Sequence, residues 1–158
     1  MARVSQGCDA VRSKVALTKV ERVRKYGEVF TPDWMVKRMC DELPEDAFQP
    51  EKTFLEPACG DGAFLVEILR RKFDHCRTRA DYSVSLRSVY GMEIQADNVQ
   101  KSIERVTELC REYFNPSKDD LQVINDHVIL CDSLKVMRMM HDPQLQEDHG
   151  RTGEHHGD

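Results

Sequence analysis

The 158-residue sequence has no Cys-x-x-Cys pair among its six cysteines, and it has no long run of apolar residues. The spacings of its cysteines and histidines match no zinc-finger pattern, which argues against a structural zinc site. It also lacks the basic start and apolar segment of a secretory signal. We therefore expect no metal site and no membrane span, and we expect reduced, mostly buried cysteines in a cytoplasmic protein.

The composition is that of one folded domain with an uneven distribution of charge. Hydrophobic residues make up 40% of the chain and charged residues 32%, which suits a normal core at this length. Residues 1–25 hold seven Lys or Arg against two acidic residues, whereas residues 26–158 hold 16 against 26. We predict a basic helical arm over residues 1–25, which either contacts nucleic acid or is simply a solvated helix.

The C-terminal segment, residues 137–158, is predicted to be a disordered tail rich in histidine and acidic residues. From His141 onward it carries four of the six histidines and shows no apolar periodicity. A metal-binding pair at His155 and His156 is the alternative, and a disordered segment is the simpler interpretation.

Between these segments, the spacing of apolar residues predicts helices that alternate with strands. Thr31 suits an N-cap and Pro32 the first helical position, so a helix of about three turns follows and ends at Leu43-Pro44. Residues 74–86 are either a loop or a broken helix, and residues 135–140 are a short helical turn. The third strand lies within residues 121–131, most simply at 127–131. The remaining predicted elements are strands at 53–58 and 88–94 and helices at 63–73 and 97–114.

The order strand, helix, strand, helix, strand is typical of a parallel βαβαβ unit. A turn with two glycines, Gly60 and Gly62, joins the first strand to its helix. Glycines there let the backbone approach a ligand closely, and the following helix aims its N-terminal N–H groups at the same place. Together with a second strand that ends in an acid, this turn predicts a nucleoside-cofactor pocket.

The carboxyl ends of the three predicted strands, where ligands of such sheets bind, carry acidic side chains: Glu56, Glu93 and Asp132. Glu93 suits the two hydroxyls of a ribose, or it is an exposed acid at a helix start. Asp132 suits the exocyclic amine of an adenine, or it is a helix N-cap. Glu56 accepts hydrogen bonds from a ligand ammonium group or from backbone N–H groups of the turn. Ile94 and Leu134 either sandwich the adenine ring or belong to the core.

Four segments, taken in order, resemble the N6-adenine DNA methyltransferases of restriction–modification systems. Residues 56–64 resemble the (D/E)PACGxGxF cofactor loop of that family, and residues 27–32 resemble its G-x-x-(F/Y)-T-P segment. Residues 91–94 and 131–134 are similar to its ribose and adenine motifs. The resemblance covers about residues 22–136, and four segments in the family's order are far more specific than one glycine-rich turn.

The resemblance implies an α/β fold of the Rossmann-like class I methyltransferase type, truncated to a three-stranded parallel βαβαβ unit with N-terminal helices. It implies that residues 26–136 bind S-adenosylmethionine, with the Phe-Thr-Pro segment closing over the methionine part. An NAD site is disfavoured because the turn lacks G-x-G-x-x-G. The cofactor-binding residues that it implies are Phe30, Thr31, Pro32, Glu56, Pro57, Ala58, Cys59, Gly60, Gly62, Phe64, Glu93, Ile94, Asp132, Ser133 and Leu134.

The catalytic motif of the family, (N/D/S)-P-P-(Y/F/W), is absent from the sequence. In the family its polar side chain and a proline carbonyl accept hydrogen bonds from the target amine, and its aromatic ring stacks on the flipped base. Residues 115–117 precede the third strand, and residues 142–144 lack the second proline, so neither segment fits. We assign no catalytic residue. A sheet that stops after three strands would also leave residues 53–58 as an open edge, which invites pairing.

The main hypothesis is an S-adenosylmethionine-dependent DNA methyltransferase of the adenine-N6 class, or its cofactor-binding fragment, inactive alone. Duplex DNA is then the expected partner of the complete enzyme. We expect a truncated or decayed gene product, the N-terminal piece of a split enzyme, or a module that associates with itself or a protein partner through the open edge. The alternative is a non-catalytic S-adenosylmethionine-binding module or split-enzyme subunit that contacts a protein or DNA. Enzymes that methylate glutamine or RNA use similar motifs, and the Phe-Thr-Pro segment favours DNA.

Overall fold

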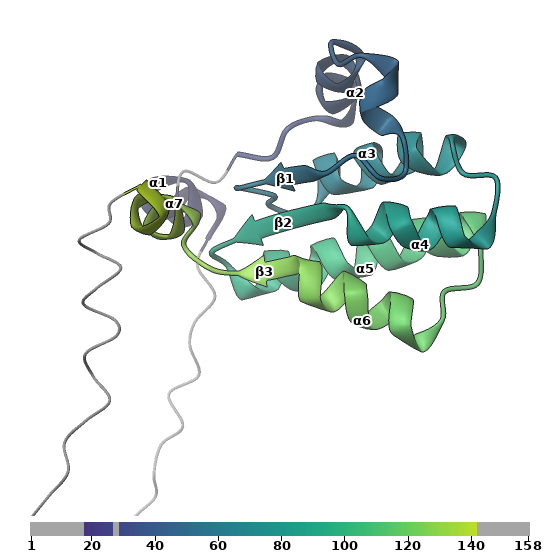
Figure 1. The fold of residues 1–158 in the computed structure, drawn as a ribbon. Coiled ribbons are helices and arrows are strands. Elements are labelled where there is room, and N and C mark those ends of the chain that lie inside the picture. The colour runs from purple at the N-terminus through teal and green to yellow at the C-terminus, as the bar shows by residue number, and fades with distance from the viewer. Residues whose placement is uncertain (1–17, 27–28, 142–158) are drawn as a thin grey trace, which may run out of the picture.

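Three parallel strands, in the order β1-β2-β3, form the sheet of the computed structural model, which describes residues 18–26 and 29–141. The strands are β1 (Phe54–Glu56), β2 (Val89–Glu93) and β3 (Val128–Leu130). Their arrows point the same way in Figure 1. The predicted parallel unit is thus confirmed, with each strand shorter than predicted.

The helices of the described part are α1 (Lys19–Tyr26), α2 (Asp33–Asp41), η1 (Glu45–Phe48), α3 (Ala63–Asp74), α4 (Arg79–Arg87), α5 (Ala96–Tyr113), α6 (Lys118–His127) and α7 (Ser133–His141). The helices predicted at 63–73 and 97–114 are confirmed as α3 and α5. For residues 74–86 the sequence left a loop and a broken helix as alternatives. These residues contain most of α4, so the broken helix is the correct alternative. The helical turn predicted at 135–140 lies within α7. None of these described helices is long and apolar enough to cross a membrane.

Helix α6 was not predicted, whereas the third strand lies within residues 127–131, as predicted. Ser117 and Asp120 form a capping box, in which the Ser117 hydroxyl accepts from the Asp120 N–H and the Asp120 carboxylate accepts from the Ser117 N–H at 2.7 Å. The β-branched residues Val123 and Ile124 are therefore buried on the face of a helix. The strand itself begins only at Val128.

Helix α2 begins one residue later than predicted. Its N-cap residue is Pro32, no side chain caps it, and Asp33 is the first helical residue. The prediction of Thr31 as the cap is therefore wrong, since the Pro32 carbonyl accepts the first helical hydrogen bonds. The predicted end is confirmed, because α2 stops at Asp41, before Pro44.

The two predicted terminal segments lie mostly outside the described residues. Helix α1 belongs to the last part of the predicted basic arm, and residues 1–17 are not described. Helix α7 continues through residues 137–141, where the tail was expected to begin. The predicted disorder of the tail and the pair His155-His156 lie beyond the described residues.

The hydrophobic core lies between the sheet and helices α3 and α5, which cover one face of the strands (Figure 1). Its side chains are at most 8% exposed and include Leu65, Leu69, Val89, Val106 and Val128. The five described cysteines are free, and three of them are buried: Cys40, Cys59 and Cys110. This agrees with the prediction of reduced, mostly buried cysteines.

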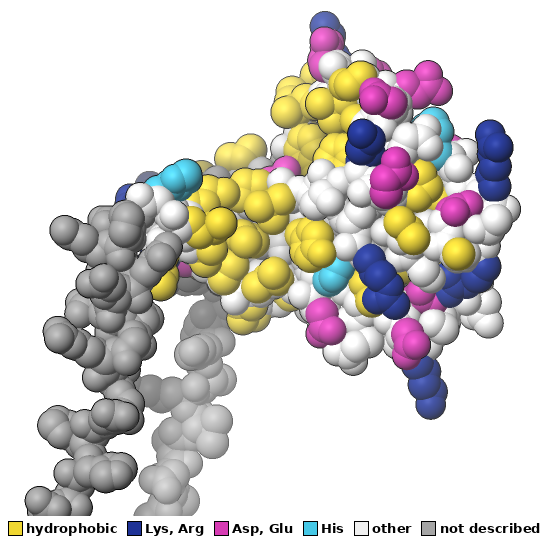
Figure 2. Space-filling model, in the orientation of Figure 1, with side chains coloured by type: hydrophobic (Ala, Val, Ile, Leu, Met, Phe, Trp, Pro, Cys, Tyr) yellow, Lys and Arg dark blue, Asp and Glu magenta, His cyan; other side chains and the backbone are white. Residues whose placement is uncertain are grey.

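The other face of the sheet has no helix over it in the part of the chain that the structure describes (Figure 1). Side chains alternate along strands and paired residues share a face, so this open face consists of Leu55, Tyr90, Met92 and Ile129. Leu55 is 51% exposed and Ile129 37%. Figure 2 shows hydrophobic side chains gathered over the strands and beside α7. Strand β1 is also an edge, because it pairs only with β2 among the described strands.

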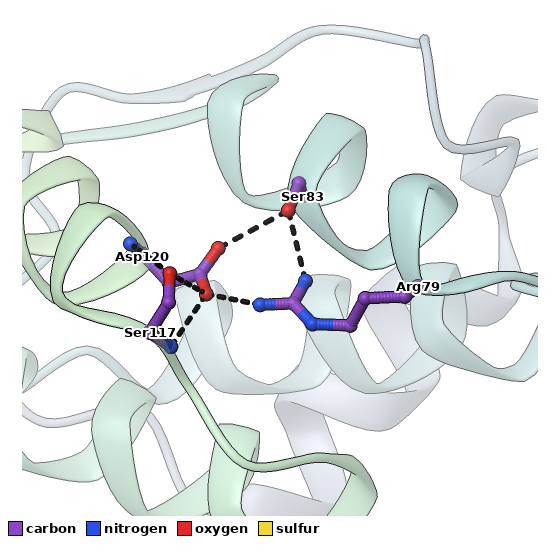
Figure 3. A network of polar contacts seen from close by, with 4 residues as sticks. All are labelled: Arg79, Ser83, Ser117 and Asp120. Atoms are coloured by element: carbon purple, nitrogen blue, oxygen red, sulfur yellow. Dashed lines mark hydrogen bonds and ion pairs between the residues drawn. The ribbon is translucent and has the colours of Figure 1, made fainter.

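A polar network joins the start of α4 to the start of α6, at the amino ends of the strands (Figures 1 and 3). The buried carboxylate of Asp120 accepts hydrogen bonds from Ser117 Oγ at 2.6 Å and Ser83 Oγ at 3.1 Å, and it pairs with Arg79. Burial raises the pKa of Asp120, but the hydrogen bonds from Ser117, Arg79 and Ser83 outweigh burial and lower the pKa below its ordinary value. The network therefore holds a charged carboxylate with its partners supplied by the protein.

Candidate functional site

The turn between β1 and α3 is shaped by its two glycines, which both have positive φ: 54° at Gly60 and 86° at Gly62. The Gly62 N–H donates to the Cys59 carbonyl at 2.8 Å, which closes the turn. A Cβ at Gly62 would lie 3.0 Å from the Ser102 Cα, so α5 packs directly on this position. Ser102 Oγ also donates to the Gly60 carbonyl at 2.9 Å. Only glycine satisfies both the backbone conformation and the close approach at residue 62.

Cys59 connects the turn to β2 through contacts with Met92 and Gly91. Its N–H donates to the Met92 carbonyl at 3.0 Å, and a Cβ at Gly91 would lie 2.9 Å from its sulfur. Burial raises the pKa of the Cys59 thiol to about 12. The thiol is therefore neutral at physiological pH, and its contacts support the turn rather than nucleophilic chemistry.

Glu93 links the turn to the segment after β2. Its Oε2 accepts from the Gly60 N–H at 3.0 Å and its Oε1 from the Gln95 N–H at 2.8 Å. Glu93 is only 8% exposed, so it is not the exposed acid of the alternative interpretation. Glu56 Oε1 accepts from the Ala58 N–H at 3.1 Å, which is the backbone contact expected as one of its two possible roles.

Asp132 lies between β3 and α7 and also contacts backbone. Its Oδ1 accepts from the Lys135 N–H at 3.2 Å, and Lys135 Nζ lies 3.9 Å from Oδ2. The capping contact of the alternative interpretation is therefore present. The side chain of Asp132 remains 32% exposed, which leaves acceptor capacity for a ligand.

These segments surround a cavity of about 520 Å³ at the carboxyl ends of the strands. This volume lies within the range of roughly 300–1,000 Å³ that is typical of ligand pockets. All four motif segments contribute to its wall, through nine of the predicted residues: Phe30, Pro57, Ala58, Gly60, Glu93, Ile94, Asp132, Ser133 and Leu134. The fold thus brings together segments that are up to about a hundred residues apart in the sequence.

Six predicted residues are set back from the cavity wall: Thr31, Pro32, Glu56, Cys59, Gly62 and Phe64. Pro32 is the N-cap residue of α2, and Gly62 is the N-cap residue of α3. Phe64 packs against the core, and Thr31 is half-buried. With Glu56 and Cys59, these residues shape the backbone that carries the wall.

Five further residues line the cavity without having been predicted: Lys25, Val29, Gln95, Cys131 and Met137. Val29, Gln95 and Cys131 flank predicted residues in the sequence, so a search one residue wider would have found them. Lys25 and Met137 lie on α1 and α7, and no local pattern indicates them. Among the described residues, no group of three His, Cys, Asp or Glu side chains could hold a metal ion.

The sequence profile of the family described as N-6 DNA Methylase matches residues 16–106, more than half of the chain. The chain belongs to this family. Its three-stranded sheet is accordingly a truncated Rossmann-like methyltransferase fold, as the resemblance implied. The match includes the turn and Glu93 and ends before Asp132.

The Type II methyltransferase M.VspI of Vibrio sp. (strain 343) is 34% identical to the chain over 86 residues. These residues are 54% of this chain and 18% of that methyltransferase. The chain therefore spans less than a fifth of the length of this relative. No solved structure matches the chain.

Proposed function

We propose that the chain binds S-adenosylmethionine in the cavity at the carboxyl ends of the strands, as the cofactor-binding part of an adenine-N6 DNA methyltransferase. The observation that carries the proposal is the meeting of all four motif segments around one cavity of about 520 Å³. The family match supports the reaction class and the DNA substrate. Bound there, the cofactor would supply an activated methyl group, and the chain would bind and orient it.

The cavity wall fits the nucleoside part of this cofactor. Each carboxylate oxygen of Glu93 accepts one backbone hydrogen bond, and its further lone pairs suit vicinal ribose hydroxyls. Asp132 would accept from the exocyclic amine of the adenine. Ile94 and Leu134 are 48% and 65% exposed, so they offer apolar surface to the ring.

The glycine turn fits the other end of the cofactor. The ring of Phe30 faces Gly60, and a Cβ at Gly60 would lie 3.9 Å from Phe30 Cε1. The missing side chain leaves the backbone of the turn accessible to a ligand. We assign the methionine part to this region, between Phe30 and the turn.

Calorimetric titration with S-adenosylhomocysteine, the demethylated product, tests the proposal. We expect binding to the wild-type chain and about tenfold weaker binding to Asp132→Asn, because a hydrogen bond to a charged acceptor is lost. Asp126→Asn makes the same change on the exposed end of α6 and should bind like wild type. A wild-type chain that does not bind would refute the proposal, and equal binding by both variants would refute the role of Asp132.

The chain alone should not transfer the methyl group, since its sequence has no (N/D/S)-P-P-(Y/F/W) motif. The measurement is transfer of a labelled methyl group from S-adenosylmethionine to adenine-containing duplex DNA. We expect no transfer by the chain alone and transfer when a polypeptide that supplies the motif is added. Transfer by the chain alone would contradict the assignment of no catalytic residue.

The open face favours a second function, that of a subunit which completes its domain with another polypeptide. Parallel sheets are normally covered on both faces, and an edge strand offers unpaired backbone groups to a partner strand. The aligned residues make up only 18% of this relative, so most of a methyltransferase of that length lies outside them, and we propose that further methyltransferase sequence, rather than a second copy, pairs with β1 and covers Leu55 and Ile129.

Co-expression with the product of the adjacent reading frame, followed by sedimentation, tests this subunit role. We expect a one-to-one complex that Leu55→Glu abolishes, because a charge would be placed in the middle of the covered face. A matched change on a distant exposed surface, Val84→Glu on α4, should leave the complex intact. A homodimer of the isolated chain that Leu55→Glu dissociates would instead identify a second copy as the occupant.

A further inference from the structure

Helix α1 is short, and its first turn is fixed by a capping box. The Thr18 N–H donates to Glu21 Oε2 at 2.7 Å and the Glu21 N–H to Thr18 Oγ1 at 3.3 Å, which forms a capping box. The helix has only eight residues, and helices of this length are marginal in water without tertiary contacts. Its position therefore depends on what it binds elsewhere in the chain.

Arg22 supplies such a contact to the start of α5. Its Nη1 donates to Asp97 Oδ2 at 2.7 Å, and its Nη2 donates to Asp97 Oδ1 at 3.3 Å and to Asn98 Oδ1 at 3.2 Å. The Arg22 side chain is only 18% exposed, and Asn98 is fully buried. The hydrogen bond from Arg22 lowers the pKa of Asp97 below its ordinary value. A two-pronged arginine–carboxylate contact of this kind fixes orientation as well as distance.

The two helices that this contact joins each adjoin or carry residues that line the cavity. Helix α5 begins directly after Gln95, which lines the cavity together with the other residues at the strand ends. Lys25 lies nearly one turn beyond Arg22 on α1 and also lines the cavity, as do Val29 and Phe30 after it. Fixing α1 to α5 thus sets the distance between the strand-end wall and the wall made by the N-terminal segment.

We propose that Arg22 is a positioning residue for the cavity. Its contact with Asp97 and Asn98 holds Lys25, Val29 and Phe30 in place as the second wall of the ligand site. This inference rests on the proposed function for the identity of the ligand. The sequence offered two roles for the basic arm, contact with nucleic acid or a simply solvated helix. The proposed role of Arg22 differs from both, because this arginine positions residues of the chain's own cavity.

The expected effect follows from the population of the assembled site. When only a fraction of molecules is competent to bind, the apparent affinity falls by that fraction. Arg22→Gln removes the charge of the contact and leaves Asp97, which is 51% exposed, free to be solvated. We expect binding of S-adenosylhomocysteine to weaken by roughly threefold to tenfold, the range for losing a partly exposed charged contact.

The experiment compares four forms of the full chain by titration with S-adenosylhomocysteine: wild type, Arg22→Gln, Arg22→Lys and Arg24→Gln. Arg24 is an exposed arginine on the same helix, so its variant controls for charge and helix propensity and should bind like wild type. Arg22→Lys keeps the charge without the two-pronged geometry and should bind with intermediate affinity. The melting temperature without ligand should be nearly the same in all four, because the core does not include α1.

Hydrogen exchange without ligand separates this inference from the proposed function. In Arg22→Gln the amides of α1 should exchange faster, while those of α3 and α5 keep their protection. Faster exchange together with weaker binding supports the inference. Unchanged exchange in α1, or faster exchange with unchanged affinity, would overturn it. If the wild-type chain binds no S-adenosylhomocysteine, the proposed function fails first, and exchange alone then decides whether Arg22 holds α1.

Discussion

The two ends of the sheet both hold charged side chains, but they use them differently. At the amino ends, Lys72 is fully buried and its Nζ donates to the carbonyls of Gln49 and Lys52 at 2.6 and 2.7 Å. Asp120 at the same end is enclosed by hydroxyl, backbone and guanidinium donors (Figure 3). At the carboxyl ends, Glu93 and Asp132 line a cavity instead. The comparison teaches that charged side chains are fully enclosed by protein donors and acceptors at one end, whereas at the other end they line a ligand-sized space.

Replacing Asp120 should give the largest loss of stability at the amino ends. Asp120→Ala removes the capping box of α6 and leaves Ser117 and Ser83 without their acceptor, which should lower the free energy of unfolding by about 3 kcal/mol. Urea denaturation measures this loss. Asp119→Ala, on the exposed first turn of the same helix, should cost about 0.5 kcal/mol or less. The affinity for S-adenosylhomocysteine should not change in either variant. A large change would contradict the claim that the enclosed charges at the amino ends of the strands do not contribute to the ligand site.

Replacing Gly62 should have the next largest effect, and it acts at the carboxyl ends. Gly62→Ala forces a positive φ of 86° on a side chain whose Cβ would lie 3.0 Å from the Ser102 backbone. We expect a loss of about 2–3 kcal/mol in unfolding free energy, together with weaker ligand binding. Gly60→Ala is the matched control, because its Cβ meets nothing closer than 3.9 Å and only the φ of 54° opposes it. Equal costs at both positions would show that packing on α5 does not restrict the turn.

The buried lysine gives a smaller, pH-dependent effect. Burial lowers the pKa of Lys72 from its ordinary 10.5 to about 8. The folded state thus binds this proton less tightly than the unfolded state, so the charged form opposes folding below pH 8. This opposition fades as the pH rises towards 10.5. Relative to Lys72→Met, the wild-type chain should gain about 2 kcal/mol of unfolding free energy between pH 7.5 and 9.5. Urea denaturation at both pH values measures the difference, and a constant difference would contradict the assignment.

The order of the elements could be predicted because the main signals are local. The apolar periodicity of α3 and α5 and the glycine turn after β1 depend only on neighbouring residues. Helix α6 was missed because Val123 and Ile124 run into the β-branched strand that follows. The signal that identifies this helix is the capping box, in which Ser117 is followed three residues later by Asp120.

The site was predictable in outline and not in its contacts. The four motif segments indicated most of the cavity wall, since parallel strands end at a common edge of the sheet. The hydrogen bond from the Gly60 N–H to Glu93 and the contact of Arg22 with Asp97 join residues 33 and 75 positions apart. No sequence pattern specifies such pairs, because they arise from how the helices pack on the sheet.

A co-crystal structure with S-adenosylhomocysteine tests the central claim most directly. We predict that the nucleoside will occupy the cavity, with its ribose hydroxyls donating to Glu93 and its adenine between Ile94 and Leu134. A ligand bound at any other surface of the chain, or a cavity left empty at saturating concentration, would contradict the account.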